Sequence, residues 1–297
     1  MRIGTRASAL ALAQAKSVAE LLADAEIHPM LTSGDRGARV QDKSRWVLEL
    51  ENALRTGEID VAVHSAKDVP CEPAEGLALV AAPRRAAAED VLCGAGSLAE
   101  LPAGAKVGTS SARRAAQLRA WRADLEVVPA RGNVDTRLDK LQRGEFDAIV
   151  LARAGLQRLA RDDAAGGTLD PAQFVPAPGQ GTLALQARSG DARVREALTP
   201  ISDAGAFECL LAERALARAL GADCHTPLGA HAVRVAGQLH VRAWVGLPDG
   251  STWVSDELLG DEASPEELGR ELATRLELVG AGEILARARE MALAQTR

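Results

Sequence analysis

Short apolar runs that end in polar residues alternate with segments of helical pattern in the first part of the chain. Runs typical of buried strands lie at residues 2–5, 30–32 and 61–63. Between them, helices are predicted over residues 9–23 and 46–54, the first with Ser8 as its N-cap, and residues 33–44 are predicted to form a loop. The alternation of strands and helices indicates an α/β fold.

The same pattern recurs further along the chain. A basic residue, an aliphatic residue, Gly and Thr open both passages, at residues 2–5 and again at residues 106–109. Residues 54–61 and 141–148 each combine a helix end, a Gly-Glu turn and a buried strand. Two matches in the same order predict two α/β domains of like topology, whose equivalent strand ends face each other across a cleft.

The last third of the chain follows a different pattern. A helix, a loop and antiparallel strands are predicted in turn, over residues 207–220, 221–227 and 230–254. Ser264 and Glu267 then predict a capping box at the start of a further helix. This third unit is therefore predicted to be α+β.

Two connectors complete the predicted organisation. Residues 84–90 follow the first domain, and residues 174–181 are dense in Pro and Gly. The predicted fold class is two α/β domains followed by a small C-terminal α+β domain. The expected domain limits are 1–84 with 182–200 for the first domain, 89–175 for the second and 204–297 for the third.

Composition and charge disfavour some classes of function and favour others. The chain has no Tyr, three Phe and four Trp, so its cores must be aliphatic, and single-stranded nucleic acid binding through aromatic stacking is disfavoured. The net charge is −6, yet residues 108–158 hold ten Lys and Arg against six Asp and Glu. An acidic chain with a basic middle predicts a localised anion site. No apolar stretch approaches membrane-spanning length, and a cytoplasmic location is expected.

The four cysteines are widely scattered and form no CxxC pair. This spacing predicts neither a disulfide framework nor a metal site. Cys224 lies in the predicted loop between a helix and a sheet. Two interpretations stay open for it: a small buried side chain, or a nucleophile and covalent attachment point close to arginines.

The apolar run 61–63 leads into the most polar turn of the chain. Lys67 and Asp68 follow it closely, and Pro70 removes a backbone donor and biases the residue before it away from helix. Ligands of open α/β sheets bind beyond the carboxyl ends of the strands, which predicts a site at Lys67 and Asp68. The alternative is that Asp68 only forms a turn.

Three further segments are suited to bind anions. They are Arg6 with Ser8, residues 108–114, and Arg131 with Arg137. Helix N-termini and arginine side chains bind carboxylates or phosphates. The alternative for each is structural, because adjacent arginines such as Arg113 and Arg114 often lie on a solvated helix face and serines often serve only as caps.

Six motifs in fixed order carry a family resemblance. They lie at residues 2–8, 61–70, 107–114, 131–137, 178–181 and 213–224. In order and spacing they cover nearly the whole chain and resemble the porphobilinogen deaminases, also called hydroxymethylbilane synthases. The resemblance implies two domains like those of periplasmic binding proteins and a small domain that carries the cofactor.

The resemblance also implies an activity. Members of this family condense four porphobilinogen molecules head to tail with release of ammonia and hydrolyse the product to a linear tetrapyrrole. Their primer is a dipyrromethane held by a thioether, for which the matching residue here is Cys224. The implied partners are porphobilinogen and the growing polypyrrole chain, with no nucleic acid and no membrane, and a monomer is expected.

Individual roles follow from the matching motifs. Asp68 is implied as the central catalytic carboxylate, and Lys67 beside it is implied as a second catalytic residue. The residues implied to hold the cofactor are Cys224, Lys67, Asp68, Thr109, Ser110, Ser111, Arg113, Arg114 and Arg131. The residues implied to bind substrate are Arg6, Ser8, Arg131, Arg137, Arg158 and Gln180.

The sequence departs from the family pattern at three places. Residues 42–45 stand where a Gly-Lys-Gly is usual, Ala222 and Asp223 replace the small pair before the cysteine, and Gln186 stands where Glu is common. An acidic neighbour disfavours thiolate formation at Cys224. The competing interpretation is a two-domain receptor for a small carboxylate, which would carry no covalent adduct.

Overall fold

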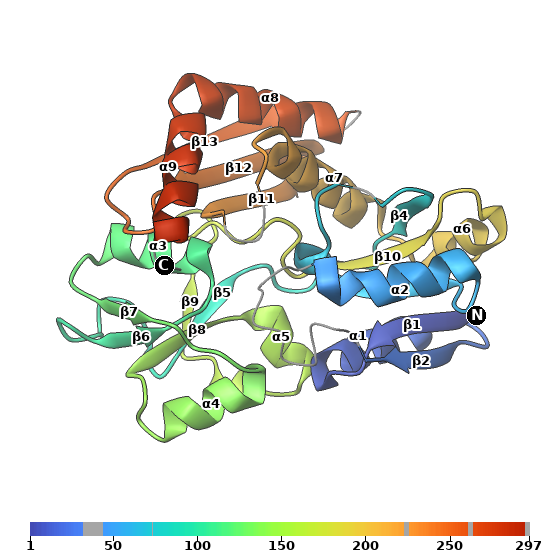
Figure 1. Ribbon diagram of the computed structural model, residues 1–297, viewed down its shortest axis with the longest axis horizontal. Helices are drawn as coiled ribbons and strands as arrows, with labels where there is room; N and C mark the ends of the chain where they lie inside the picture. The colour runs from blue at the N-terminus through green and yellow to red at the C-terminus, as the bar shows by residue number, and fades with distance from the viewer. Residues whose placement is uncertain (32–43, 73, 223–225, 261–263, 295–297) are drawn as a thin grey trace.

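The computed structural model describes residues 1–31, 44–72, 74–222, 226–260 and 264–294, and its strands form three sheets (Figure 1). The first sheet has the order β2-β1-β3-β10-β4. Its strands are β1 (Arg2–Arg6), β2 (Glu26–Met30), β3 (Val61–Ser65), β4 (Leu77–Ala81) and β10 (Leu183–Arg188). The helices beside it are α1 (Ala9–Ala19), α2 (Ser44–Thr56), the 3₁₀ turn η1 (Ala66–Asp68), α6 (Ala192–Leu198) and η3 (Thr199–Ile201).

The second sheet repeats this topology with the order β7-β6-β8-β5-β9. Its strands are β5 (Asp90–Cys93), β6 (Lys106–Gly108), β7 (Glu126–Val128), β8 (Ala148–Ala152) and β9 (Gly167–Leu169). Its helices are α3 (Ala112–Trp121), α4 (Val134–Gln142), α5 (Arg153–Arg158) and η2 (Asp162–Ala164). In both sheets the first three strands pair in parallel, and the remaining two join in antiparallel fashion.

The repeat predicted from the sequence is confirmed at the level of single hydrogen bonds. The Asp60 carboxylate accepts from the Arg2 backbone N–H at 2.8 Å, and the Asp60 N–H donates to the Arg2 carbonyl at 2.9 Å. Asp147 makes the same pair of bonds with Lys106, at 2.7 and 2.9 Å. The matching residues of the two passages therefore occupy the same place in the two units.

Glycine is required at the second matching position for a packing reason. A Cβ on Gly4 would collide with the Ile59 side chain, and one on Gly108 would lie 3.0 Å from Phe146. Ile59 and Phe146 are themselves equivalent in the repeat. In each unit the strand glycine makes room for the bulky residue that precedes the third strand.

Two segments run side by side between the α/β units. Residues 82–89 lead from β4 to β5, and residues 170–182 lead from β9 to β10. The Ala86 N–H donates to the Gly181 carbonyl at 3.2 Å, and Arg85 donates to the Gln180 carbonyl at 2.9 Å. Because β10 inserts into the first sheet, the chain crosses between the two units twice.

The third unit is the α+β unit that the sequence predicts, and it touches both others (Figure 1). Its antiparallel sheet of β11 (Leu228–Val235), β12 (Gln238–Gly246) and β13 (Trp253–Gly260) packs against α7 (Ala204–Ala219), α8 (Pro265–Leu278) and α9 (Ala281–Ala294). The predicted fold class is thus confirmed. The predicted domain limits remain a proposal, which the sheet membership of β10 supports.

Several local predictions were wrong. The second strand lies at Glu26–Met30, earlier than predicted, because an edge strand that contains Pro29 lacks a continuous apolar run. Helix α1 ends at Ala19, and the chain turns through Asp24 at φ 52°. Ser264 is the N-cap of α8 but makes no side-chain capping hydrogen bond, so the predicted capping box does not form. The sequence pattern also gave no prediction of strands β4, β5, β7 and β9.

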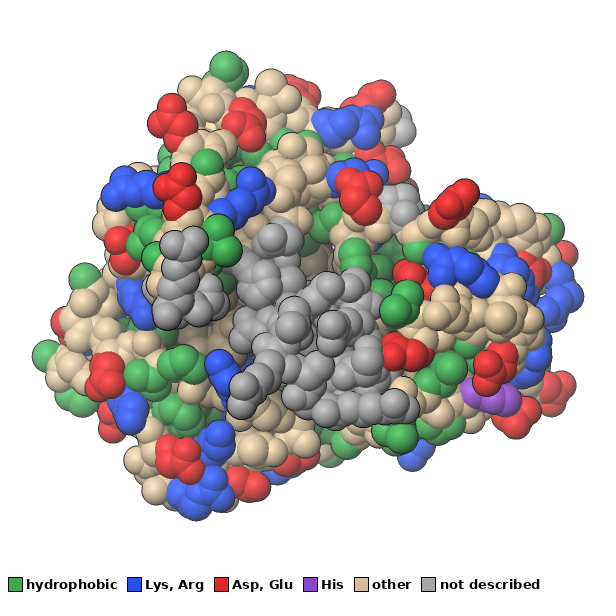
Figure 2. All heavy atoms as spheres, viewed as in Figure 1, with side chains coloured by type: hydrophobic (Ala, Val, Ile, Leu, Met, Phe, Trp, Pro, Cys, Tyr) green, Lys and Arg blue, Asp and Glu red, His purple; other side chains and the backbone are tan. Residues whose placement is uncertain are grey.

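Acidic and basic side chains are interspersed over the face shown in Figure 2, with no single broad basic patch among the residues drawn in colour. No helix within the described part of the chain is both long and apolar enough to cross a membrane.

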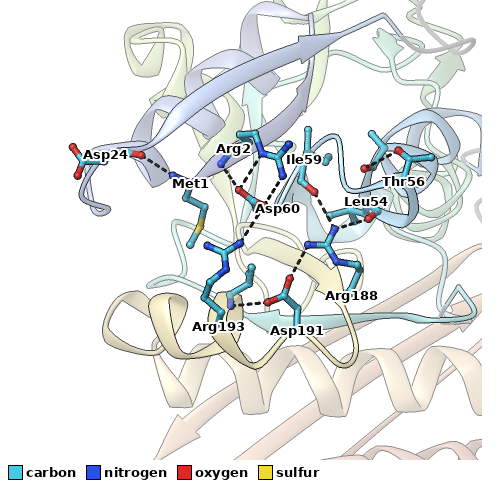
Figure 3. Close-up of polar contacts among 12 residues, drawn as sticks. Met1, Arg2, Asp24, Leu54, Thr56, Ile59, Asp60, Arg188, Asp191 and Arg193 are labelled. Carbon is cyan, nitrogen blue, oxygen red and sulfur yellow. Dashed lines mark hydrogen bonds and ion pairs between the residues drawn. The ribbon is translucent and has the colours of Figure 1, made fainter.

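At the amino end of β3, Asp60 forms ion pairs with two guanidinium groups (Figure 3). Arg2 lies 2.9 Å and Arg193 3.3 Å from its carboxylate. The hydrogen bond from Arg2 lowers the pKa of Asp60 to about 2. The Asp60 side chain is 8% exposed, so the pair is only partly screened by solvent.

We expect Asp60→Asn to lower the unfolding free energy near pH 7 by on the order of 1 kcal/mol, because the charge-assisted bond is lost. A carboxylate whose pKa is lowered on folding stabilises above its unfolded pKa, so the difference from wild type should shrink as pH falls from 3.8 through about 2. Urea unfolding across this range measures it. Asp147→Asn is the control, since among the described residues that carboxylate receives only a backbone bond from Lys106; equal losses in both variants would contradict the prediction.

Candidate active site

Lys67 and Asp68 lie where the sequence predicts them, at the carboxyl end of a buried strand. They belong to η1, which follows β3 directly, and both are half-buried. Val69 closes the turn in an extended conformation, with φ −84° and ψ 128°, as expected for a residue before Pro70. The turn therefore presents a cation and a carboxylate at the end of the first sheet.

A fully buried carboxylate, Asp90, faces this turn from the second unit. Arg113 pairs with it at 2.8 Å and Arg114 at 2.6 Å. Burial opposes ionisation of Asp90, but the two guanidiniums outweigh burial and hold its pKa well below the ordinary range. The alternative that Arg113 and Arg114 lie on a solvated helix face is wrong, since both are buried.

The two arginines differ in what they leave over for a ligand. Arg114 uses its three nitrogens on Asp90 and the Val150 carbonyl. Arg113 donates to the Val175 carbonyl at 2.8 Å, while its buried Nε has no hydrogen-bond partner among the described residues. Arg113 is therefore the better placed of the two to bind a further acceptor.

Gln180 joins Lys67 to Asp90. Its amide nitrogen donates to Asp90 at 2.8 Å and to the Ala88 carbonyl at 2.7 Å, and its oxygen accepts from the Lys67 ammonium at 3.3 Å. Burial lowers the pKa of Lys67 to about 7, with Arg114 contributing in the same direction. Lys67 can therefore gain or lose a proton near neutral pH.

The hydroxyl residues at the start of α3 are partly used by the fold. Ser111 caps the helix by accepting from the Arg114 N–H, and Thr109 accepts from the Ser111 N–H at 3.2 Å. Ser110 is exposed and donates to the Ala130 carbonyl at 2.8 Å. The interpretation of Ser111 as a helix cap is therefore correct. The amino end of α3 lies close to Asp90, because Arg113 and Arg114 of its first turn pair with that carboxylate.

Among the described residues, two of the other predicted arginines of the second unit bind backbone carbonyls rather than Asp90. Arg131 is exposed before α4, and Arg137 is half-buried and donates to the Gly132 carbonyl at 2.8 Å. Arg158 of α5 donates to the Gly181 carbonyl at 2.7 Å. Burial lowers the pKa of Arg137 and of Arg158 to about 10, so both remain cations at neutral pH.

In the first unit, Arg6 ends β1 and Ser8 caps α1 by accepting from the Ala11 N–H, as predicted. Neither residue is among those that line the cavity described next. Hydrogen bonds and ion pairs join Lys67, Gln180 and the α3 arginines through Asp90. Asp68, like Arg6 and Ser8, is outside the residues that line the cavity.

A cavity of about 420 Å³ lies where the three units meet. Lys67 lines it from the first unit, Ser111 and Arg113 from the second, and Arg214 and Arg218 from the third. Its size falls in the range of small-molecule sites. Its lining thus holds four cationic side chains and one carboxylate, Glu72, which lies 3.9 Å from Arg218, and this excess of cations predicts an anionic ligand.

Arg214 and Arg218 of α7 were not predicted to be site residues, although both lie within the family motif at residues 213–224. Arg214 donates to the carbonyls of Val69 and Pro70, and Arg218 donates to the carbonyl of Cys71 at 2.9 Å. They attach the third unit to the turn that follows Asp68. Asp90 was assigned to the connector at residues 84–90 and was not predicted to be a site residue, because its partners are distant in sequence. Its position at the start of an apolar run was the available signal.

Cys224 lies outside the described residues. Its described neighbours in the chain, Ala222 and Thr226, both line the cavity. The loop predicted to carry the cofactor therefore begins and ends at the cavity wall.

Comparisons with known proteins agree on one family. The model of the "Porphobilinogen deaminase, dipyromethane cofactor binding domain" matches residues 1–196, and the model of the "Porphobilinogen deaminase, C-terminal domain" matches residues 207–277. Solved structures that match include a periplasmic VFT2 domain of BvgS from Bordetella pertussis, 19% identical with a TM-score of 0.39, covering 67% of this chain and 84% of that one. At that TM-score the likeness adds nothing to the assignment.

Curated relatives match over almost their full length. The porphobilinogen deaminase of Thermus thermophilus is 45% identical over 97% of this chain and 98% of its own. That of Deinococcus radiodurans is 43% identical with the same coverage. Together with the two family models, which cover most of the sequence, these matches confirm the resemblance drawn from the motifs: the chain belongs to the porphobilinogen deaminase family.

Proposed function

We propose that this protein is a hydroxymethylbilane synthase, which condenses four porphobilinogen molecules head to tail, releases ammonia and hydrolyses the product to a linear tetrapyrrole. The observation that carries the proposal is the cavity between the three units, with Lys67 on one wall and arginines on the others. Porphobilinogen and its oligomers are polycarboxylates, so a cationic cavity suits them. The family matches leave the receptor interpretation without support.

The residues of the cavity fit a dipyrromethane cofactor. Such a group carries several carboxylates, and Lys67, Arg113, Arg214 and Arg218 would face them. Within the described part of the chain, the buried Nε of Arg113 is a donor without an acceptor, as expected where a ligand completes the hydrogen bonding. When bound through Cys224, the cofactor would supply a primer that keeps the growing chain attached.

Asp68 is proposed as the catalytic carboxylate. Loss of ammonia from an aminomethylpyrrole leaves a cation, and attack by a second pyrrole creates another. A half-buried carboxylate held on a short turn stabilises both and can accept a proton from the pyrrole. Lys67, beside it, is proposed to bind a substrate or cofactor carboxylate while it is protonated.

The outlying cations are proposed to act on later rings. Arg6, Arg131, Arg137 and Arg158 do not line the cavity, and each added ring brings two carboxylates that need partners. Thr109, Ser110, Ser8 and Gln180 are proposed as polar contacts of the same ligand. A cytoplasmic location and a monomeric state remain predictions from the sequence.

Cys224→Ser is expected to fold but to carry no covalent pyrrole adduct, because no thiol remains at the proposed attachment point. Intact-protein mass spectrometry of the purified variant measures this directly. Cys71→Ser is the matched control, since Cys71 lines the same cavity and should leave the adduct in place. An adduct on Cys224→Ser, or its loss from Cys71→Ser, would show that the attachment point is misassigned.

Asp68→Asn should keep its fold and its affinity for porphobilinogen but lose about 10²–10⁴-fold in kcat, because an amide neither stabilises a cation nor accepts a proton as a carboxylate does. Steady-state assays with porphobilinogen measure the loss. Asp60→Asn makes the same chemical change at the other end of β3 and should stay within a few-fold of wild type. An Asp68→Asn variant equally close to wild type would reduce Asp68 to a turn former.

Lys67 should impose an alkaline limit on substrate capture. Since burial lowers its pKa to about 7, the unliganded enzyme loses this cation as pH rises through that value. Lys67→Arg keeps the charge at all accessible pH values, so kcat/KM should be lower in absolute terms but should not fall with this titration. Profiles of kcat/KM between pH 6 and 10 compare the two; superimposable profiles would exclude Lys67 as the titrating group.

A further inference from the structure

Gln117 of α3 is a fully buried side chain that the proposed function does not use. Its amide closes a ring of hydrogen bonds with the backbone of Val175, which belongs to the second connector. The Gln117 nitrogen donates to the Val175 carbonyl at 2.9 Å, and the Gln117 oxygen accepts from the Val175 N–H at 2.7 Å. Both backbone polar groups of Val175 are therefore bound by one side chain.

Arg113 binds the same carbonyl. It stands one helical turn before Gln117 on α3 and donates to the Val175 oxygen at 2.8 Å. A second nitrogen of its guanidinium lies 2.8 Å from Asp90, and its Cζ lies 5.8 Å from the centroid of the Phe174 ring. Two acceptors thus set the direction of this guanidinium, while Nε has no partner among the described residues.

Gln117 fixes the acceptor that Arg113 uses. The N–H and the carbonyl of Val175 belong to two successive peptide planes, and the Gln117 amide binds one group of each. The carbonyl oxygen has two lone pairs, so it accepts from Gln117 and from Arg113 at the same time. Loss of the amide would let this carbonyl turn with its peptide plane, and Arg113 would lose one of the two acceptors that set its direction.

The same part of the connector touches the third unit. A Cβ on Gly229 of β11 would lie 2.6 Å from the Val175 carbonyl oxygen, so the two backbones are in close contact. The Ala230 N–H donates to the Pro176 carbonyl at 2.9 Å, and Trp244 of β12 packs against Val175. Val175 therefore relates the position of Arg113 to that of the third sheet.

Building on the proposed function, we propose that Gln117 is a positioning residue for Arg113. By fixing the Val175 carbonyl, it holds the Arg113 side chain at the cavity wall in the orientation that leaves Nε for an acceptor of the ligand. A carboxylate of the dipyrromethane cofactor is such an acceptor. Gln117 is not among the described residues that line the cavity, so its effect on the cofactor passes through Arg113.

NMR of the arginine side chains measures the positioning directly. In ¹H–¹⁵N spectra of arginine-labelled protein, the Arg113 Nε–H signal is assigned by its absence from Arg113→Lys. Gln117→Met keeps the length of the side chain but loses the amide, and it should speed solvent exchange of the Arg113 Nε–H by about tenfold. The Arg114 Nε–H is the internal reference, because it donates to Asp90 at 3.0 Å, and its exchange should not change.

Cofactor loading measures the consequence. Adduct-free chains are mixed with porphobilinogen, and intact-protein mass spectrometry follows the gain of the pyrrole adduct. Gln117→Met should slow this gain by about tenfold, as expected for one weakened hydrogen-bonded contact. Because Gln117 acts through Arg113, adding Gln117→Met to Arg113→Lys should not slow the gain further.

Leu118→Ala is the matched control, since Leu118 is equally buried on α3 but packs into the core of the second sheet. It should destabilise the unit without changing Arg113 exchange or cofactor loading by more than about twofold. If Gln117→Met folds poorly, Gln117→Glu replaces it. Its carboxylate still accepts from the Val175 N–H but cannot donate to the carbonyl, so the same exchange and loading changes are expected.

Three results would overturn the proposal. They are an equal loss of protection at Arg113 and Arg114, a wild-type loading rate despite faster exchange at Arg113, or a double variant in which the two effects multiply. Each would leave Gln117 as a structural support of α3. A wild-type chain that gains no adduct would count against the proposed function instead, and the exchange rates would still decide whether Gln117 positions Arg113.

Discussion

One buried carboxylate, Asp90, joins the first turn of α3 to the second connector. It has no exposure to solvent and pairs with Arg113 and Arg114, while Gln180 donates to it from the second connector. The carboxylate could not stay charged there alone, and the arginines could not stay buried without it. Removing one partner of such a group costs about 3–5 kcal/mol, because the remaining charges are left unpaired. Through Gln180 the same group also reaches Lys67.

A second buried carboxylate, Glu213 of α7, serves the third unit in a similar way. It binds Arg85 of the first connector at 2.7 Å, the Gly179 N–H of the second connector at 2.5 Å and the Ala232 N–H of β11 at 2.7 Å. Each contact is a charge-assisted hydrogen bond, which is stronger than a neutral one. The connectors and the third sheet are thus fixed to one group, and a cavity bounded by all three units can keep its shape.

The repeated scaffold carries different chemistry in its two copies. Asp60 and Asp147 anchor the third strand of each unit in the same way. At the other end of that strand the first unit places Lys67 and Asp68, and the second unit begins α5 with Arg153, which pairs with Asp162. The duplicated strands therefore supply the same positions in the two units, while the residues that follow them differ in charge and partners.

The sequence by itself determined the local features of this protein. The strand and turn at Lys67 and Asp68, the caps at Ser8 and Ser111, and the repeat follow from neighbouring residues, because propensity, capping and turn chemistry act over a few positions. The same motifs sufficed to identify the family. The edge strand β2 was placed too late along the chain, since it shows no continuous apolar pattern.

Only the tertiary structure decided which charged groups are buried and what they bind. In sequence, Arg113 and Arg114 look like any two adjacent arginines on a solvated helix. They are buried because they pair with Asp90, which belongs to another segment of the chain. His64 and Gln186 likewise meet across 122 positions of sequence. Whether a charged side chain is buried and paired depends on which segments the fold brings together. No local pattern of residues encodes that meeting, because the partners lie far apart in sequence.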